Sequence, residues 1–137
     1  MKFSNIIKPF LLTLIVAMFP QLLSAYDFKV DGLCYNYNDD GTSVTVTYQK
    51  TDSYGDGDGY YYLVGNLVIP SSVTYKGKSY SVTSIDNGAF CGCNGLTSVT
   101  IPNSVTSIGF EAFLYCSGLT SVDLGNSVTW IREYAFF

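Results

Sequence analysis

Apolar and polar positions recur in the second half of the chain with a period of 23 residues. Segment 81–103 is followed without a spacer by segment 104–126, and the two are identical at 14 of 23 positions. A third copy begins at residue 127. Such a period predicts a repeat solenoid, because one unit is too small to bury its apolar face alone. The apolar positions that both copies keep are Val82/Val105, Ile85/Ile108, Ala89/Ala112, Phe90/Phe113, Cys93/Cys116, Leu96/Leu119, Val99/Val122 and Ile101/Leu124.

Each unit carries one clear strand pattern. Residues 96–101 end in strict alternation, with Val99 and Ile101 on one side and hydroxyl side chains on the other. This period of two is typical of a half-buried strand. The equivalent segment 119–124 follows one period later, so we expect the two strands to lie side by side in a parallel β ladder.

The segment that connects one strand to the next predicts a short helical turn. It is too short for a stable α-helix, so we expect a single turn of α or 3₁₀ geometry. Gly95 and Gly118 follow these segments, and a glycine after a helical turn commonly adopts the left-handed conformation that ends it.

The repeat resembles the BspA-like class of bacterial leucine-rich repeats. Its pattern is L-x-x-V-x-I-P-x-S-V-x-x-I-x-x-x-A-F-x-x-C-x-G-L, which covers residues 81–126, the truncated copy at 127–137 and, more loosely, 64–82. The resemblance implies that the strand ladder lines a concave face and that the Ala-Phe turns lie on the convex side. The chain departs from the pattern at Gly125, which replaces Pro, and at Trp130, which replaces Ser. Both departures are expected near surface turns, where they would alter only the loop shape.

The first 25 residues predict a secretory signal peptide. Lys2 and Lys8 give a basic start, residues 10–19 form an apolar run, and the small residue Ala25 offers a cleavage position. The alternative is an uncleaved anchor. It is disfavoured because a membrane-spanning helix needs about 20 apolar residues. We therefore expect a secreted or cell-surface protein without membrane insertion after signal removal.

Residues 26–63 predict an N-terminal β cap with a Gly/Asp-rich loop. The turn signal at 39–41 separates two alternating segments and predicts an antiparallel β-hairpin. Such a cap would cover the open edge of the first rung of the ladder.

The Gly/Asp-rich loop at 51–62 offers no credible metal site. Asp56 and Asp58 invite a calcium interpretation, but Tyr54 and Gly65 stand where an EF-hand needs its first and last ligands. We therefore predict an ordinary surface loop and no metal or cofactor.

The repeat region is expected to span residues 64–137. A short insertion in its first unit predicts a small hairpin that turns at Lys76 and Gly77. The expected units are a partial repeat at 64–80, full repeats at 81–103 and 104–126, and a truncated repeat at 127–137. Because residue 137 falls inside an Ala-Phe turn, we expect the open C-terminal end to pair with another chain or with further repeats.

The four cysteines leave their redox state open. Cys93 and Cys116 occupy equivalent positions in adjacent units, roughly 5 Å apart. Their side chains point in parallel, which favours a buried thiol ladder, but a disulfide between them remains an alternative. Cys91 could pair with Cys34 if the cap folds back, and the sequence does not choose between these pairings.

Composition excludes several classes of function. The chain has no histidine, which removes Ser-His-Asp and Cys-His catalysis and the usual zinc sites. Glu111 and Glu133 lie on expected outer turns without a pocket, so no enzyme is predicted. Residues 26–137 carry five basic and eleven acidic residues, a net charge of −6. Nucleic acid and anionic membrane surfaces are therefore poor partners.

Binding is the function that remains, with two candidate surfaces. The tyrosines Tyr60, Tyr61 and Tyr62 form either cap packing or an aromatic recognition patch. The outward positions of the ladder would form a flat, hydroxyl-rich face suited to a broad contact with an extended protein: Asn66, Val68, Ser98, Thr100, Ser121 and Asp123.

Two functions are compatible with these surfaces. The first is a secreted or cell-surface module for protein–protein interaction, and the family resemblance implies adhesion to host extracellular proteins or to bacterial surfaces. The alternative is a carbohydrate-binding module in which Tyr60–Tyr62 contact a surface glycan.

Overall fold

The computed structural model describes residues 26–48 and 63–137. These residues form strands and turns and contain no helix. The strands are β1 (Phe28–Val30), β2 (Leu33–Tyr37), β3 (Ser43–Thr47), β4 (Gly65–Val68), β5 (Ser72–Tyr75), β6 (Lys78–Ile85), β7 (Leu96–Thr100), β8 (Ser107–Ile108), β9 (Ser121–Asp123) and β10 (Trp130–Ile131). No helix in this part of the chain is long and apolar enough to cross a membrane.

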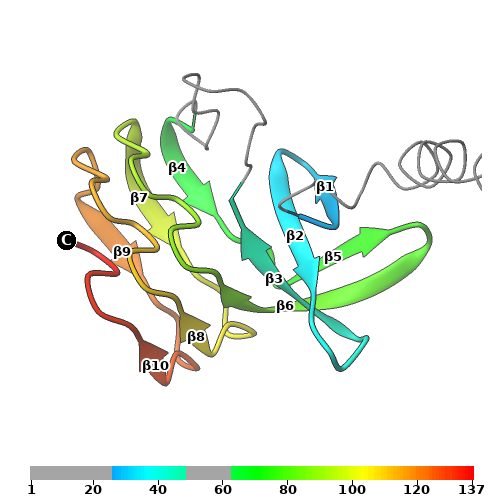
Figure 1. The fold of residues 1–137 in the computed structure, drawn as a ribbon. Helices are drawn as coiled ribbons and strands as arrows, with labels where there is room; N and C mark the ends of the chain where they lie inside the picture. Colours follow the sequence, from blue (N-terminus) through cyan, green and yellow to red (C-terminus); the bar gives the residue numbers. More distant parts are fainter. Residues whose placement is uncertain (1–25, 49–62) are drawn as a thin grey trace, which may run out of the picture.

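The strands form two sheets, and each full repeat contributes one strand to each (Figure 1). The three-stranded ladder has the order β4-β7-β9, and all its strands are parallel. The mixed sheet has the order β1-β2-β3-β6-β8-β10, with β5 pairing β6. Within it β3, β6, β8 and β10 are parallel, while the pairings of β1 with β2, β2 with β3 and β5 with β6 are antiparallel. The predicted parallel ladder and the antiparallel start of the chain are therefore confirmed.

Residues one period apart occupy equivalent places. Val99 pairs with Val122 across β7 and β9. The rings of Phe90 and Phe113 stack with centroids 5.0 Å apart and planes 12° apart, and Phe113 stacks on Phe136 at 5.1 Å and 4°. The 23-residue period thus becomes a continuous column of aromatic rings.

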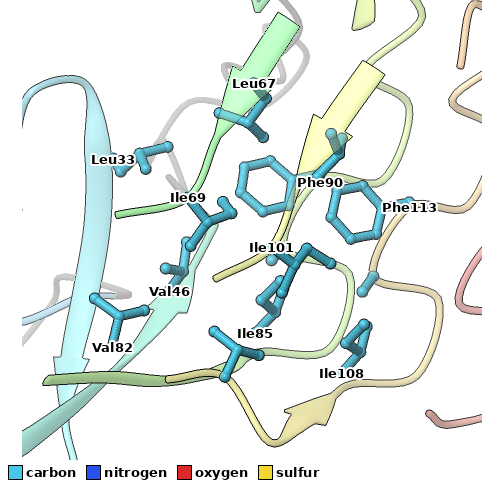
Figure 2. Close-up of a cluster of buried hydrophobic side chains, with 14 of the residues drawn as sticks. Leu33, Val46, Leu67, Ile69, Val82, Ile85, Phe90, Ile101, Ile108 and Phe113 are labelled. Atoms are coloured by element: carbon cyan, nitrogen blue, oxygen red, sulfur yellow. The ribbon is translucent and has the colours of Figure 1, made fainter. Parts of the chain in front are cut away.

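The core lies between the two sheets and the Ala-Phe turns (Figure 2). Leu67 and Ile69 enter it from the ladder side, Val82 and Ile85 from the mixed sheet, and Phe90 from a turn. All five side chains are buried. β-Branched residues suit these strand positions because they pack well on a pleated surface.

The segment between the strands of a repeat is a series of tight turns, so the predicted helical turn is not confirmed. Every second amide closes a local turn onto the carbonyl three residues earlier, as Cys91 does onto Gly88 at 3.1 Å. A helix would use the remaining amides for its own bonds. Here they donate to the next repeat at 2.7–2.8 Å instead: Gly88 to Phe110, Phe90 to Ala112, and Gly92 to Leu114.

This turn requires positive φ angles at two positions per repeat. The first full repeat places Gly88 (φ 61°) and Gly92 (φ 77°) there. The second uses Glu111 (φ 55°) and Tyr115 (φ 59°), residues for which the left-handed conformation is unfavourable. The bonds between repeats hold the same backbone path even where the sequence no longer supplies glycine.

Gly95 and Gly118 have a different role from the one predicted. Neither has a positive φ, so neither closes a turn in the left-handed conformation. A Cβ atom on Gly118 would lie 2.4 Å from the carbonyl oxygen of Asn94, and one on Gly95 would lie 2.6 Å from a methyl of Val64. These glycines are needed because the preceding repeat approaches too closely for a side chain.

The N-terminal cap extends the mixed sheet. The predicted hairpin of β2 and β3 is present, and an Asp31-Gly32 turn adds β1 to it. However, β3 pairs with β6, so within the described residues the cap continues the mixed sheet and not the three-stranded ladder that we expected it to cover. The Asn38 amide seals this junction by donating to Ser43 Oγ at 2.7 Å and to Thr83 Oγ1 at 3.0 Å.

The hairpin predicted in the first repeat is confirmed. Strands β5 and β6 turn at Lys76 and Gly77, which both have positive φ, and Tyr75 pairs with Lys78. The Tyr75 ring stacks on Phe28 of the cap at 4.4 Å. The hairpin and the cap therefore share an aromatic contact in addition to the sheet.

Candidate functional site

The structure brings the six outward ladder residues together in two columns. The first column contains Asn66, Ser98 and Ser121, and the second contains Val68, Thr100 and Asp123. Neighbouring members are direct register partners on adjacent parallel strands, so their backbones lie roughly 4.8 Å apart. We call these two columns the ladder face.

The ladder face is exposed because its residues alternate with buried ones. Leu67 and Val99 point into the core between the two columns. Thr100 and Asp123 are exposed, and Val68 exposes 65 % of its surface. An exposed valine between polar neighbours gives this otherwise hydrophilic surface one apolar contact point.

Hydrogen bonds orient the side chains of the first column but leave part of their hydrogen-bonding capacity available to a partner. Asn66 Oδ1 accepts from Ser98 Oγ at 2.8 Å and from Thr97 Oγ1 at 3.2 Å. These bonds orient the amide so that its nitrogen, a donor of two bonds, is directed away from them. The Thr97 carbonyl accepts in turn from Thr120 Oγ1 at 3.1 Å in the next repeat.

Asp123 gives the ladder face its only charge among the six. One carboxylate oxygen accepts from the Gly125 amide at 3.0 Å, which fixes the side chain at the end of β9. The second oxygen keeps its capacity to accept. The face can therefore accept hydrogen bonds at Asp123 and offer hydroxyl groups beside it, which is chemistry suited to binding a polar partner.

Several predicted features lie outside the described residues. They are the signal peptide at 1–25, the whole Gly/Asp-rich loop at 51–62, and the aromatic patch of Tyr60, Tyr61 and Tyr62 within that loop. The related rings of Tyr75 and Tyr80 are described, and both pack near Phe28 in the cap.

None of the four cysteines forms a disulfide bond. Cys93 and Cys116 are buried, and Cys116 Sγ donates to the Phe90 carbonyl at 3.1 Å. The hydrogen-bonded contact with Cys116, together with burial, raises the pKa of Cys93. Burial and the carboxylate of Glu111 raise the pKa of Cys91. The hydrogen bond with Cys93 lowers the pKa of Cys116. The thiols of Cys91 and Cys93, whose pKa values are raised, are poor nucleophiles near neutral pH.

Glu111 and Glu133, the acidic residues for which the sequence predicted no catalytic role, are joined by their backbones. The Glu111 amide donates to the Glu133 carbonyl at 3.2 Å, so the two residues lie in adjacent repeats. In the part of the chain that the structure describes, no group of three or more His, Cys, Asp or Glu residues could hold a metal ion.

Sequence reasoning missed a second exposed surface, on the mixed sheet. Trp130 lies in the short strand β10, between the turns at 125–127 and 133–136, and it is register partner to Ser107. Its side chain exposes 63 % of its surface. The signal was available in the sequence, because Trp130 interrupts a position that the two preceding repeats fill with serine.

Comparison with known families identifies the repeats. The family model described as "BspA type Leucine rich repeat region (6 copies)" matches residues 64–137, which is more than half of the chain. No curated protein matches the chain.

Solved structures of bacterial proteins share this fold. A leucine-rich repeat protein from Bacteroides capillosus ATCC 29799 is 36 % identical with a TM-score of 0.63, over 80 % of this chain and 72 % of that one. One from Bacteroides ovatus ATCC 8483 is 34 % identical with a TM-score of 0.61, over 75 % of this chain and 24 % of that one. A leucine rich cell surface protein from Faecalibacterium prausnitzii A2-165 is 26 % identical with a TM-score of 0.54, over 80 % of this chain and 33 % of that one. This chain thus corresponds to only part of each.

Proposed function

Because the chain belongs to the BspA-type leucine-rich repeat family, we propose that it is a secreted or cell-surface module that binds other proteins through its ladder face. The binding is of the adhesion type, to host extracellular proteins or to proteins on bacterial surfaces. The module holds no cofactor and catalyses no reaction.

The observation that carries this proposal is the ladder face itself. Its polar side chains stand at a fixed spacing on parallel strands that the core holds in register. Hydroxyl, amide and carboxylate groups, with one exposed valine, suit a broad contact with an extended polypeptide. The face lacks the aromatic anchors that dominate tight interfaces, so we expect modest affinity for a single copy.

Two further observations support the proposal. One similar structure is that of a protein described as a leucine rich cell surface protein. The sequence of residues 1–25 has the basic start and apolar run of a secretory signal. Export would bring the ladder face to the partners that adhesion requires.

A plate-binding assay tests the proposal. The purified chain is applied to immobilised extracellular matrix proteins, mucin and bacterial cells, and binding is compared with that of Thr100→Arg. Thr100 lies in the central strand of the ladder, so a large cation there should obstruct the face and reduce binding at least about tenfold.

The matched control is Thr74→Arg. Thr74 is an exposed strand threonine outside the ladder, so it introduces the same charge and size elsewhere. Binding to none of these surfaces by the native chain, or equal loss in both variants, would contradict the proposed role of the ladder face.

A further inference from the structure

Trp130 occupies an unusual place on the outward side of the mixed sheet. The register connects Thr45 to Ser84, Ser84 to Ser107, and Ser107 to Trp130. Small hydroxyl side chains thus fill the first three places of this column, and a large indole fills the fourth. Within the described residues Trp130 makes no ring contact with another aromatic side chain. The indole is therefore not explained by core packing.

A second column beside it carries opposite charges at its ends. Asp86, Gly109 and Arg132 are one period apart from one another. The glycine leaves no side chain between the carboxylate and the guanidinium group, whose backbones are separated by two strand spacings, or roughly 10 Å. Gly109 itself is required, because a Cβ atom there would lie 2.5 Å from the Asn87 amide nitrogen.

The two columns line an open hollow of about 220 Å³. Its lining includes Ser84, Ser107 and Trp130 from the first column and all three residues of the second. Pockets for drug-sized ligands measure about 300–1,000 Å³, so this smaller hollow matches a single ring of a ligand whose remainder extends into solvent. An aromatic wall with a few converging polar groups is the usual composition of a small-ligand site.

The charged groups at the hollow are oriented and still have bonding capacity. Asp86 Oδ2 accepts from Thr47 Oγ1 at 3.0 Å, and Oδ1 accepts from the Asn87 amide at 2.8 Å. These bonds fix the carboxylate but use only two of its roughly four acceptor positions. Arg132 is exposed and offers five N–H donors.

We propose that this hollow is a subsite for a single uncharged hexose ring, such as the terminal residue of a surface glycan. One C–H face of the ring packs on the indole of Trp130. Ring hydroxyls donate to Asp86 and accept from Arg132, and Ser107 forms the floor. The site is separate from the ladder face and adds a saccharide ligand to the protein partner proposed above.

Charge favours this ligand over others. An acidic peptide would be attracted by Arg132 but repelled by Asp86. A basic peptide would be attracted by Asp86 but repelled by Arg132. A ligand with several hydroxyl groups satisfies both ends, because each hydroxyl can donate and accept. Its ring also presents an apolar face of suitable size to the indole, whereas nucleic acid is disfavoured by the net charge of −6 for residues 26–137.

The chain's single tryptophan makes the test specific. Its fluorescence, excited at a wavelength where the tyrosines do not absorb, reports on Trp130 alone. The protein is titrated to millimolar concentration with glucose, galactose, mannose and N-acetylglucosamine, and a glycan array of neutral oligosaccharides is probed in parallel. We expect a saturable change of the emission with at least one sugar, and array binding to glycans that end in that sugar.

Variants assign the binding to the hollow. Trp130→Ser restores the residue of the preceding repeats, so it should keep the fold by circular dichroism while glycan binding falls at least about tenfold. Asp86→Asn and Arg132→Gln should each weaken binding about tenfold. Tyr115→Ser removes another exposed aromatic ring, outside the hollow, and should leave binding unchanged.

Several outcomes would overturn the inference: no sugar response on either assay, unchanged glycan binding by a folded Trp130→Ser variant, or a fluorescence response to short neutral peptides but not to sugars. Failure of the ladder-face proposal is distinguishable, since Thr100→Arg should bind glycans normally and Trp130→Ser should bind protein-coated plates normally.

Discussion

At the scale of single residues, Asp40 shows how one side chain closes a turn. Its carboxylate accepts from Ser43 Oγ at 2.6 Å and from the amides of Thr42 and Ser43 at 2.7 Å each. The Ser43 hydroxyl bond, followed by the two amide bonds, lowers the pKa of Asp40 to about 2 from its ordinary 3.8. The ionised form therefore stabilises the turn between β2 and β3.

This pKa predicts the pH dependence of the turn. Because the folded-state pKa is lowered, the contribution is complete above about pH 4 and is lost as the pH falls through about 2. Asp40→Asn should lower the unfolding temperature at pH 7, and the difference from the native protein should narrow between about pH 4 and pH 2. Thermal unfolding followed by circular dichroism measures it, with Asp39→Asn as the control. A difference that stays constant down to pH 2 would show that the charge of Asp40 plays no part.

The residue scale also shows what sequence can reveal about individual positions. The Asp-Gly signals at 39–41 correctly marked a turn, because their preference is local. The role of Gly118 was misread, since its requirement comes from the Asn94 carbonyl of another repeat. Trp130 was expected near a surface turn, and its strand was not predicted because two strand residues give no detectable alternation.

At the scale of elements, Gly118 sets how closely neighbouring repeats pack. Its Cβ position lies 2.4 Å from the Asn94 carbonyl oxygen and 2.8 Å from that of Leu96. Both contacts are with backbone, which cannot move aside as a side chain can. The close spacing of the turns therefore requires a residue without a Cβ atom at this position.

Gly118→Ala should consequently lower the free energy of unfolding by about 1–3 kcal/mol through overpacking. Chemical denaturation with urea measures this loss. Ser117→Ala, at the neighbouring exposed position, should change stability by no more than about 0.5 kcal/mol. Equal stability of Gly118→Ala and the native chain would mean that the repeats can separate at no cost.

The elements differ in how far the sequence predicts them. The parallel ladder followed from the alternation around Val99 and Val122 and from the period. The parallel pairing of β6, β8 and β10 in the mixed sheet could not be predicted in this way. Strand β8 has only two residues, so its sequence looks like that of a connection. The turns were predicted as helical because their composition does not reveal that alternate amides bond to another repeat.

At the scale of the whole molecule, the mixed sheet joins the cap to the most distant repeat. Its hydrogen-bonded order runs from β1 through β3, β6 and β8 to β10 (Figure 1). Asn38 strengthens the junction by bonding Ser43 and Thr83, and its Oδ1 accepts from Thr45 Oγ1 at 2.7 Å. We therefore expect the cap and the repeats to unfold as one unit.

Asn38→Ala tests this coupling. Loss of three partly buried hydrogen bonds should cost about 1–3 kcal/mol. The unfolding midpoint should fall equally in far-ultraviolet circular dichroism and in the fluorescence of Trp130, at the far end of the sheet. Asn36→Ala, whose side-chain oxygen accepts from Asp27 within the cap, is the control with a smaller expected effect. Unchanged Trp130 fluorescence would show that the cap melts separately.

The backbone bonds between turns have a mechanical consequence. Each repeat is tied to the next along three lines, through the ladder, through the mixed sheet and through alternate amides of the turns. Neighbouring repeats therefore cannot splay apart on one side without stretching bonds on another. The repeats therefore form a stiff array in which equivalent residues are spaced roughly 4.8 Å apart. Any change of shape on binding has to be made by the partner.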